Sequence, residues 1–258
     1  MATGNLSEDA VAYLQEHKVE ALFESLLHDL LIGLPDKPLD HLLGLLRKLP
    51  TPKIVIAGPP AGGKGTQCQK IVERFGVVHI STGDILRDHT QRGTEFGKKA
   101  SEYMSKGMLV PDDLIISLVK DRLSQDDVFQ RGWLLDGFPR TRSQAISLQT
   151  AGIIPNALIV LDVSDSVVVN RIAGRRTDPA TGAVYHTTAN PPPAGLHVIQ
   201  RADDTEEAIT VRLRLFHANL HEVLACYRSI SVHINGEQDK DVVAAEVIEQ
   251  LEHRIVLV

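Results

Sequence analysis

The segment Gly58-Pro59-Pro60-Ala61-Gly62-Gly63-Lys64-Gly65-Thr66 has the clearest chemical pattern in the chain. It directly follows the apolar run 53–57 and opens a stretch of helical pattern. In such a strand–loop–helix arrangement, backbone N–H groups and the helix N-terminus surround phosphate oxygens, and the lysine reaches the β- and γ-phosphates. Gly65 stands where a Ser or Thr usually follows the lysine, and Thr66 comes one position later. The spacing predicts a phosphate-binding loop.

Arginines recur after this loop. Phosphoryl transfer between two nucleotides brings two polyanions together, so the site must supply several fixed cations. Arginine suits this task because its planar fork binds phosphate oxygens bidentately. An acceptor that is already an anionic phosphate requires no general base, in keeping with the missing Ser/His/Asp and Cys/His arrangements. The candidate cations, which are the arginines at positions of the family motifs quoted below, are Arg87, Arg140, Arg171, Arg175, Arg201 and Arg212.

A switch GTPase is disfavoured. The sequence contains no Asn-Lys-x-Asp for guanine and no Asp-x-x-Gly after a strand. An enzyme that transfers the phosphoryl group to a small acceptor is favoured instead.

The elements that position these residues alternate between short apolar runs and helical patterns. Such alternation predicts an α/β fold with a doubly wound parallel sheet. The segment 177–199, with its prolines and glycines, is expected to be a loop or small flap. The expected strands are 53–57, 77–80, 133–135, 157–161 and 230–234, and the expected helices include 63–75, 165–175, 206–227 and 241–253.

Composition narrows the function further. The chain has 258 residues, a formal charge of −6 and 43% apolar residues, so it can bury a sizeable core. The acidic balance argues against a nucleic-acid-coating protein, and no apolar run is long enough to cross a bilayer. The N-terminus lacks a signal-peptide pattern. Two cysteines, Cys68 and Cys226, form no disulfide framework, which indicates a reducing, cytoplasmic location.

Further motifs follow in a fixed order, and together they resemble the adenylate kinases over about residues 53–253. The resemblance implies a five-stranded P-loop kinase domain over 51–258, with an acceptor-binding region at about 81–110 and a lid at about 177–199. It also implies the reaction MgATP + AMP ⇌ 2 ADP. The motifs are 58–66, Ser81-Thr82-Gly83-Asp84-Ile85-Leu86-Arg87, Gly107-Met108-Leu109-Val110-Pro111-Asp112, Leu135-Asp136-Gly137-Phe138-Pro139-Arg140-Thr141, Arg171–Arg176, Tyr185-His186, Asn190-Pro191-Pro192, Arg201-Ala202-Asp203-Asp204 and Arg212-Leu213.

The resemblance assigns roles residue by residue. Catalytic roles fall to Lys64, Arg140, Arg175, Arg201 and Arg212. ATP binding falls to Ala61, Gly62, Gly63, Gly65, Thr66, Arg171, Val184, Tyr185 and Gln238, together with Lys64. AMP binding falls to Thr82, Arg87, Met108, Leu109, Val110, Gly137, Phe138 and Gln144, with Arg140. Asp136 is the expected anchor for Mg²⁺ through water.

Two departures from the family pattern affect details of the site. Ala61 places a side chain where many members have glycine, and a mild effect on the loop is expected. The lid is shorter than the long type and contains no cysteine, so no zinc-bound lid is expected. By the same resemblance, Thr82 and Gln144 favour AMP over the alternative of a UMP/CMP or other nucleoside monophosphate kinase. A weakly active nucleotide-binding scaffold is the other alternative, and the choice of ATP or GTP as donor is not readable.

Residues 1–50 have a different character and end at the stiff break Leu49-Pro50-Thr51-Pro52. Their leucines recur at helical spacing over 19–31 and 38–46, with the turn Gly33-Leu34-Pro35 between. Two short amphipathic helices need a partner to bury their apolar faces.

The pattern over about 10–48 resembles the dimerisation/docking domain of protein kinase A regulatory subunits. This resemblance implies a homodimer or binding of a helix from an anchoring protein, with anchoring at a cilium or flagellum. The alternative is that both helices pack on the kinase domain.

Overall fold

The computed structural model describes residues 7, 10, 13–14, 19–47 and 51–255. Pro52–Leu251 forms one compact unit, and the residues before Pro52 belong, with those from Glu252 on, to a second. None of the described helices is long and apolar enough to cross a membrane.

A five-stranded sheet forms the centre of the larger unit, with strand order β2-β3-β1-β4-β7. All pairings in it are parallel, as the alternation of strands and helices predicts, so the expected fold class is confirmed. β-branched and leucine residues fill the central strands, which are buried on both faces. The strands are β1 (Lys53–Ala57), β2 (Val78–Ser81), β3 (Trp133–Asp136), β4 (Ala157–Asp162) and β7 (Ser231–Asn235).

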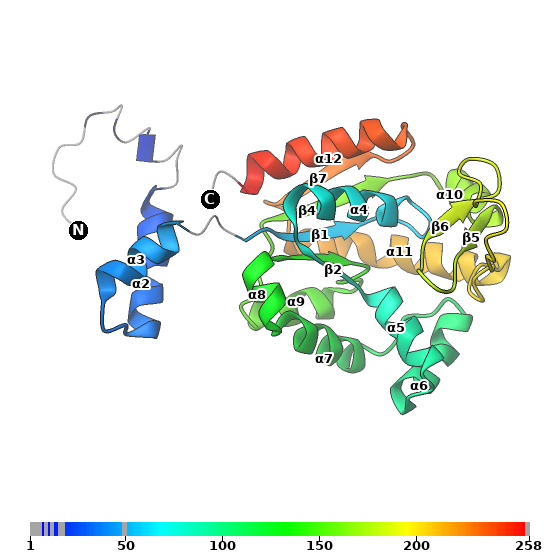
Figure 1. The fold of residues 1–258 in the computed structure, drawn as a ribbon, viewed down its shortest axis with the longest axis horizontal. Coiled ribbons are helices and arrows are strands. Elements are labelled where there is room, and N and C mark those ends of the chain that lie inside the picture. Colours follow the sequence, from blue (N-terminus) through cyan, green and yellow to red (C-terminus); the bar gives the residue numbers. More distant parts are fainter. Residues whose placement is uncertain (1–6, 8–9, 11–12, 15–18, 48–50, 256–258) are drawn as a thin grey trace. The chain divides into compact units, whose positions relative to one another are not determined.

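Helices cover both faces of this sheet (Figure 1). Val55, Leu135 and Leu158 turn one way and pack in a cluster with Leu148 and Val223 from the helices. The alternate strand residues turn the other way and are equally buried. The helices of this unit are α4 (Lys64–Phe75), α5 (Thr82–Gln91), α6 (Glu95–Ser105), α7 (Asp112–Leu123), α8 (Asp126–Arg131), α9 (Arg142–Thr150), α10 (Asp165–Ala173), α11 (Glu206–Cys226) and α12 (Lys240–Ile255).

The topology places the chemistry at one edge of the sheet. β1 lies between β3 and β4, so the chain order reverses at β1, and ligands of such sheets bind beyond the carboxyl ends of the strands at this point. The phosphate-binding loop leaves β1 there, and Asp136 ends β3 beside it, in register with Ile56.

One expected helix is too long. The helical pattern predicts a helix that runs to Arg175, whereas α10 ends at Ala173 with Gly174 as its C-cap. Arg175 then begins β5 (Arg175–Thr177), which pairs antiparallel with β6 (Val184–His186). Arg175 leaves the helix because its guanidinium forms an ion pair with Asp204, a residue from a later segment. The small hairpin that β5 and β6 form overlaps the first part of the expected flap, 177–199.

Within the described stretch 19–47, the smaller unit forms two helices, α2 (Val19–Gly33) and α3 (Pro38–Arg47), as the leucine spacing predicts. Pro38 is the first residue of α3, a position at which its missing N–H costs nothing. Leu34 adopts a left-handed conformation, φ 38°, in the turn between the helices, and its N–H donates to the carbonyl of Leu30.

Candidate active site

The phosphate-binding loop owes its shape to glycines. Gly63 is the N-cap of α4 with φ 93°, a conformation that favours glycine. A Cβ on Gly62 would lie 3.0 Å from the carbonyl oxygen of Pro59, which accepts the Gly62 N–H at 3.0 Å. Ala61 has φ 52°, so this departure from the family pattern places an alanine in the left-handed region.

Lys64 folds over its own loop. Its Nζ donates to the carbonyl oxygens of Gly58 at 2.8 Å and Pro59 at 2.7 Å. Burial lowers the pKa of Lys64 from its ordinary value to about 8; Asp136 opposes this shift, and Arg140 and Arg212 add to it. A phosphate that approached this ammonium would relieve the repulsion by the two guanidiniums.

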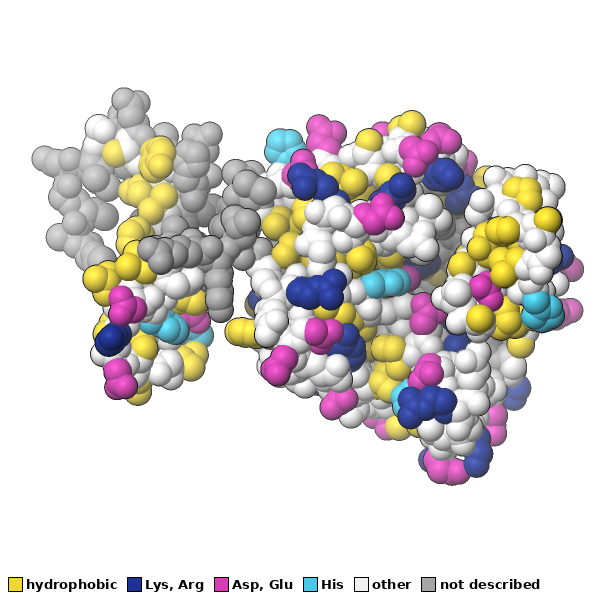
Figure 2. Space-filling model, viewed as in Figure 1, with side chains coloured by type: hydrophobic (Ala, Val, Ile, Leu, Met, Phe, Trp, Pro, Cys, Tyr) yellow, Lys and Arg dark blue, Asp and Glu magenta, His cyan; other side chains and the backbone are white. Residues whose placement is uncertain are grey.

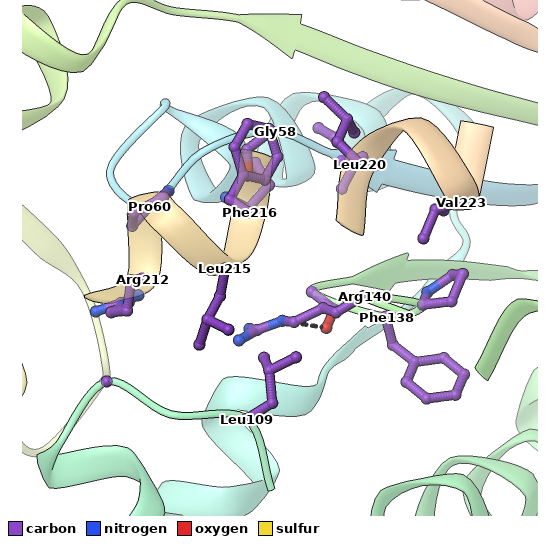
Figure 3. A pocket seen from close by; sticks show the side chains of 16 residues that line it. Gly58, Pro60, Leu109, Phe138, Arg140, Arg212, Leu215, Phe216, Leu220 and Val223 are labelled. Carbon is purple, nitrogen blue, oxygen red and sulfur yellow. Dashed lines mark hydrogen bonds between the residues drawn. The ribbon is translucent and has the colours of Figure 1, made fainter. Parts of the chain in front are cut away.

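A cleft opens beside this lysine (Figure 3). Lys64, Arg140 and Arg212 all line it, so the structure brings together cations that are far apart in the sequence. Leu109 lines it from the expected acceptor region. After Arg212, α11 also gives the cleft an apolar wall. The sequence did not reveal this wall, because the helical pattern of 206–227 does not show which face of the helix lines the site. These wall residues are Leu215, Phe216, Leu220 and Val223.

Carboxylates hold several of the arginines in place. Arg175 pairs with Asp204, and Arg212 Nη1 donates to Asp203 Oδ2 at 2.7 Å. Both aspartates belong to a motif quoted from the sequence, but neither was assigned a role. Arg87 likewise pairs with Asp84 of its own helix.

The arginines also repel one another. Burial lowers the pKa of Arg201 to about 10, and Arg87 and Arg175 contribute to that shift. Burial lowers the pKa of Arg212 to about 10 as well; Asp203 opposes the shift, whereas Arg140 and Arg175 add to it. Guanidiniums crowded in this way form a site that a polyanion would stabilise.

Several residues that were expected to bind ATP are not among those that line this cleft. Arg171 is near the phosphate-binding loop, with its Nη1 3.8 Å from where a Cβ on Gly63 would be, and it donates to the Gly236 carbonyl at 3.0 Å. Val184 and Tyr185 are in β6. Gln238 follows β7, and its Nε2 donates to the Asn235 carbonyl at 3.2 Å. Gly65 and Thr66 occupy the exposed first turn of α4.

On the acceptor side, Gly137 allows two side chains to approach the backbone closely. The Thr82 hydroxyl donates to the Gly137 carbonyl at 3.0 Å, and Arg140 Nε donates to the same oxygen at 2.7 Å. A Cβ on Gly137 would lie 2.7 Å from the Arg140 guanidinium. Phe138, the next residue, is fully buried.

Gln144 is buried, and its amide is held at both ends. Its Oε1 accepts from the Arg140 backbone N–H at 2.7 Å, and its Nε2 donates to Asp112 Oδ1 at 2.7 Å. The other Asp112 oxygen accepts from the Thr141 hydroxyl at 2.9 Å. Asp112 was not expected in this role, because only the fold brings the start of α7 to α9. Of the expected pocket wall, Met108 is half exposed and Val110 is buried.

Asp136 has the chemistry of a magnesium anchor. Burial raises the pKa of this carboxyl, but the neighbouring His79 and the positive charges of Lys64 and Arg140 lower it below the ordinary value. The group is therefore an anionic oxygen donor beside the phosphate-binding loop, which is what Mg²⁺ prefers. His79, whose Nε2 lies 3.6 Å from Asp136 Oδ2, was not foreseen from the sequence.

Comparisons with known proteins agree with this site. The family model described as adenylate kinase matches residues 56–232. A probable chloroplastic adenylate kinase 2 of Oryza sativa subsp. japonica is 46% identical over 202 residues, covering 77% of this chain and 70% of that protein. A chloroplastic adenylate kinase of Zea mays is 45% identical, covering 77% and 91%. An adenylate kinase of Trypanosoma brucei rhodesiense is 40% identical, covering 78% and 96%.

Proposed function

Because the chain belongs to the adenylate kinase family, we propose that its phosphate-binding loop binds ATP and its acceptor region binds AMP. The family activity is reversible phosphoryl transfer between adenine nucleotides, MgATP + AMP ⇌ 2 ADP. The observation that carries the site assignment is the convergence of Lys64, Arg140 and Arg212 on one cleft.

In this proposal, the cations perform the catalytic work. The Lys64 ammonium exchanges its hydrogen bonds to the Gly58 and Pro59 carbonyls for hydrogen bonds to oxygens of the ATP phosphates. Arg87 and Arg140 bind the AMP phosphate, Arg175 and Arg212 bind the donor and transferring phosphates, and Arg201 bridges the two nucleotides. Fixed positive charges of this kind stabilise the charge that spreads over the equatorial oxygens during transfer. No proton has to leave the acceptor, because the AMP phosphate is already anionic.

The proposed magnesium site uses Asp136 through a water molecule. Bound Mg²⁺ neutralises phosphate charge and orients the phosphates for in-line transfer. Asp136 would supply one carboxylate, through a bound water, and the nucleotide phosphates would supply further oxygen ligands. This arrangement suits Mg²⁺, which keeps several waters and binds through one or two carboxylates plus substrate phosphates. Arg171, Val184, Tyr185 and Gln238 are proposed to contact the ATP base and ribose.

The segment at about 177–199, which includes most of the β5–β6 hairpin, is proposed as the lid. Arg201 Nε donates to the Thr177 hydroxyl at 3.0 Å, so a proposed catalytic arginine is joined to the base of the hairpin. Closure over the nucleotides would exclude water and prevent wasteful hydrolysis of ATP.

A product assay with AMP, GMP, CMP and UMP as acceptors and with ATP and GTP as donors tests the function. We expect kcat/KM for AMP to exceed that for CMP and UMP by at least about a hundredfold, because unpaired buried polar groups penalise the wrong base. Comparable turnover of CMP would favour the UMP/CMP kinase alternative. Very low turnover of every acceptor would favour the scaffold alternative.

We further propose that the α2–α3 unit pairs with a second copy of itself. Phe23, Leu27 and Leu31 recur every fourth residue on α2 and are 66%, 50% and 64% exposed, and Leu39 and Leu43 extend the apolar surface on α3. Hydrophobic side chains also gather visibly on this unit (Figure 2). The two described helices of one copy leave this stripe exposed, whereas antiparallel pairing of two copies would give a four-helix bundle that buries it.

Light scattering on the full chain tests this pairing. The unchanged protein is expected to be a dimer, and the double variant Phe23→Glu with Leu27→Glu a monomer with unchanged kcat. Glu24→Gln on the same helix is the matched control and should stay dimeric. A monomeric unchanged protein would contradict the proposal and favour packing on the kinase domain. Dimers that persist in the double variant would place the contact elsewhere.

Residues 10–48 are also proposed to offer an anchoring-protein helix a groove on that bundle. A cytoplasmic location, with anchoring at a cilium or flagellum, stays a prediction from the sequence. A fluorescent fusion with and without the double substitution would test it.

A further inference from the structure

Three side chains of different types meet behind the phosphate-binding loop. Cys68 is in α4, His79 is in β2 and Asp136 ends β3. Their potential ligand atoms, Sγ, a ring nitrogen and a carboxylate oxygen, all lie within 4.8 Å of one another. The fold creates this cluster by pairing β2 with β3 and packing α4 against both strands.

The cluster is enclosed on one side and open on the other. Cys68 has no exposed surface, whereas the side chains of Asp136 and His79 are 14% and 32% exposed. The thiol, the imidazole and the carboxylate thus offer their ligand atoms to one small region. An ion could enter this region past the partly exposed His79 and bind between the three groups.

Sulfur, imidazole nitrogen and carboxylate oxygen are the ligand types of zinc sites. Bonds of about 2.0–2.3 Å in a tetrahedral site separate the ligand atoms by about 3.3–3.8 Å. The 3.6 Å between His79 Nε2 and Asp136 Oδ2 already has this length. Magnesium prefers oxygen ligands and octahedral geometry, so the thiol and imidazole select against it.

We propose that Cys68, His79 and Asp136 bind a zinc-type divalent cation, and that its binding inhibits the kinase. The ion bonds to the Cys68 thiolate, neutral His79 and the Asp136 carboxylate, with water in the fourth position. The Cys68 thiol proton leaves to solvent and no electron is transferred. The cluster is separate from the lid, in which the sequence offers no cysteine ligand.

Inhibition follows from the double position of Asp136. Its carboxylate faces Lys64 and Arg140 as well as His79, and it is the proposed water-mediated anchor for Mg²⁺. A carboxylate bonded to a zinc-type ion is withdrawn from that role. Cys68 is also one helical turn after Lys64 on α4, so contraction of the cluster would shift the loop lysine. The inhibitory half of the proposal rests on the proposed function; binding of the ion does not.

Titration of the nucleotide-free full chain with Co²⁺ tests the binding. Cobalt bound to a thiolate gives a near-ultraviolet charge-transfer band, and Zn²⁺ should displace it. Cys68→Ser is expected to abolish the band and weaken Zn²⁺ binding by at least about a hundredfold. Cys226→Ser, at the second cysteine of the chain, is the matched control and should keep both. Absence of the band in the unchanged protein, or its persistence in Cys68→Ser, would overturn the site.

Assays with Zn²⁺ in the presence of excess Mg²⁺ test the inhibition. The unchanged protein and Cys226→Ser should lose at least about tenfold in rate at saturating Zn²⁺, and a chelator should restore it. Cys68→Ser should lose less than about twofold under the same conditions, which also controls for formation of ZnATP. Equal inhibition of both cysteine variants overturns the inhibitory proposal. A cobalt band without inhibition also overturns the inhibitory proposal, and with it the proposed role of Asp136 as the Mg²⁺ anchor. Absence of the cobalt band overturns only the new ion site and leaves the proposed kinase function unaffected.

Discussion

Arg175 and Asp204 form a buried ion pair that joins the base of the β5–β6 hairpin to the turn before α11. The Asp204 side chain has no exposed surface and that of Arg175 is 10% exposed. Arg175 Nε donates to Asp204 Oδ2 at 2.9 Å, and a second nitrogen of the same guanidinium bonds the other oxygen. The pair therefore fixes one arginine of the cationic cluster and the position of the hairpin together.

Replacement of Asp204 by Asn should destabilise the protein. The amide retains the shape but not the charge, so the Arg175 guanidinium is left buried without its counter-ion, at a cost of about 3–5 kcal/mol. Urea unfolding followed by circular dichroism measures the change. Asp88→Asn, which breaks the exposed Arg92–Asp88 pair, should cost less than about 1 kcal/mol. Similar costs for the two variants would contradict a structural role for the buried pair.

Replacement of Lys64 by Met should leave a folded protein with kcat reduced by at least about a hundredfold, as expected for loss of a charge that stabilises the transition state. Lys70→Met is the matched control, because Lys70 lies on the same helix and its side chain is 42% exposed. Circular dichroism checks the fold and a coupled assay measures ADP formation. A loss below about tenfold in Lys64→Met would refute the catalytic assignment of Lys64.

The pH dependence of ATP use should reflect the Lys64 pKa, which burial lowers to about 8. Because the lysine loses its charge as the pH rises through this value, kcat/KM for ATP should fall above about pH 8, as this parameter reports the free enzyme. Bound phosphates favour the charged form, so kcat should stay level to a higher pH. In Lys64→Arg the fall near pH 8 should be absent; if it remains, another group causes it.

Asp112 should influence acceptor choice through Gln144. Asp112→Ala releases the Gln144 amide nitrogen and the Thr141 hydroxyl, so the amide can rotate away from the base. The preference for AMP over CMP in kcat/KM is expected to drop by at least about tenfold, with KM for ATP unchanged within about twofold. Asp113→Ala, at the exposed neighbouring residue, should change neither. Unchanged selectivity in Asp112→Ala would mean that Gln144 needs no such support.

The sequence by itself determined the elements and the local chemistry. The apolar runs, the glycine pattern of 58–66 and the helix start at Pro38 are local signals, because a strand, a loop conformation or a helix cap depends on neighbouring residues. These signals therefore predict a parallel sheet, a phosphate-binding loop at the end of its first strand and two leucine-rich helices. The site arginines were named from the resemblance to the adenylate kinases, because residue type alone does not separate them from the other arginines of the chain.

Only the tertiary structure decided which groups meet. The partners Arg175 and Asp204 are separated by 29 residues, and Gln144 and Asp112 by 32. The Cys68–His79–Asp136 cluster likewise joins a helix and two strands. Such contacts depend on strand order and on the helix face that turns to the sheet, which no local pattern encodes. For the same reason, the prediction from the sequence that the helix runs to Arg175 is wrong. Arg175 lies outside α10 because the buried carboxylate of Asp204, from a later segment, binds it.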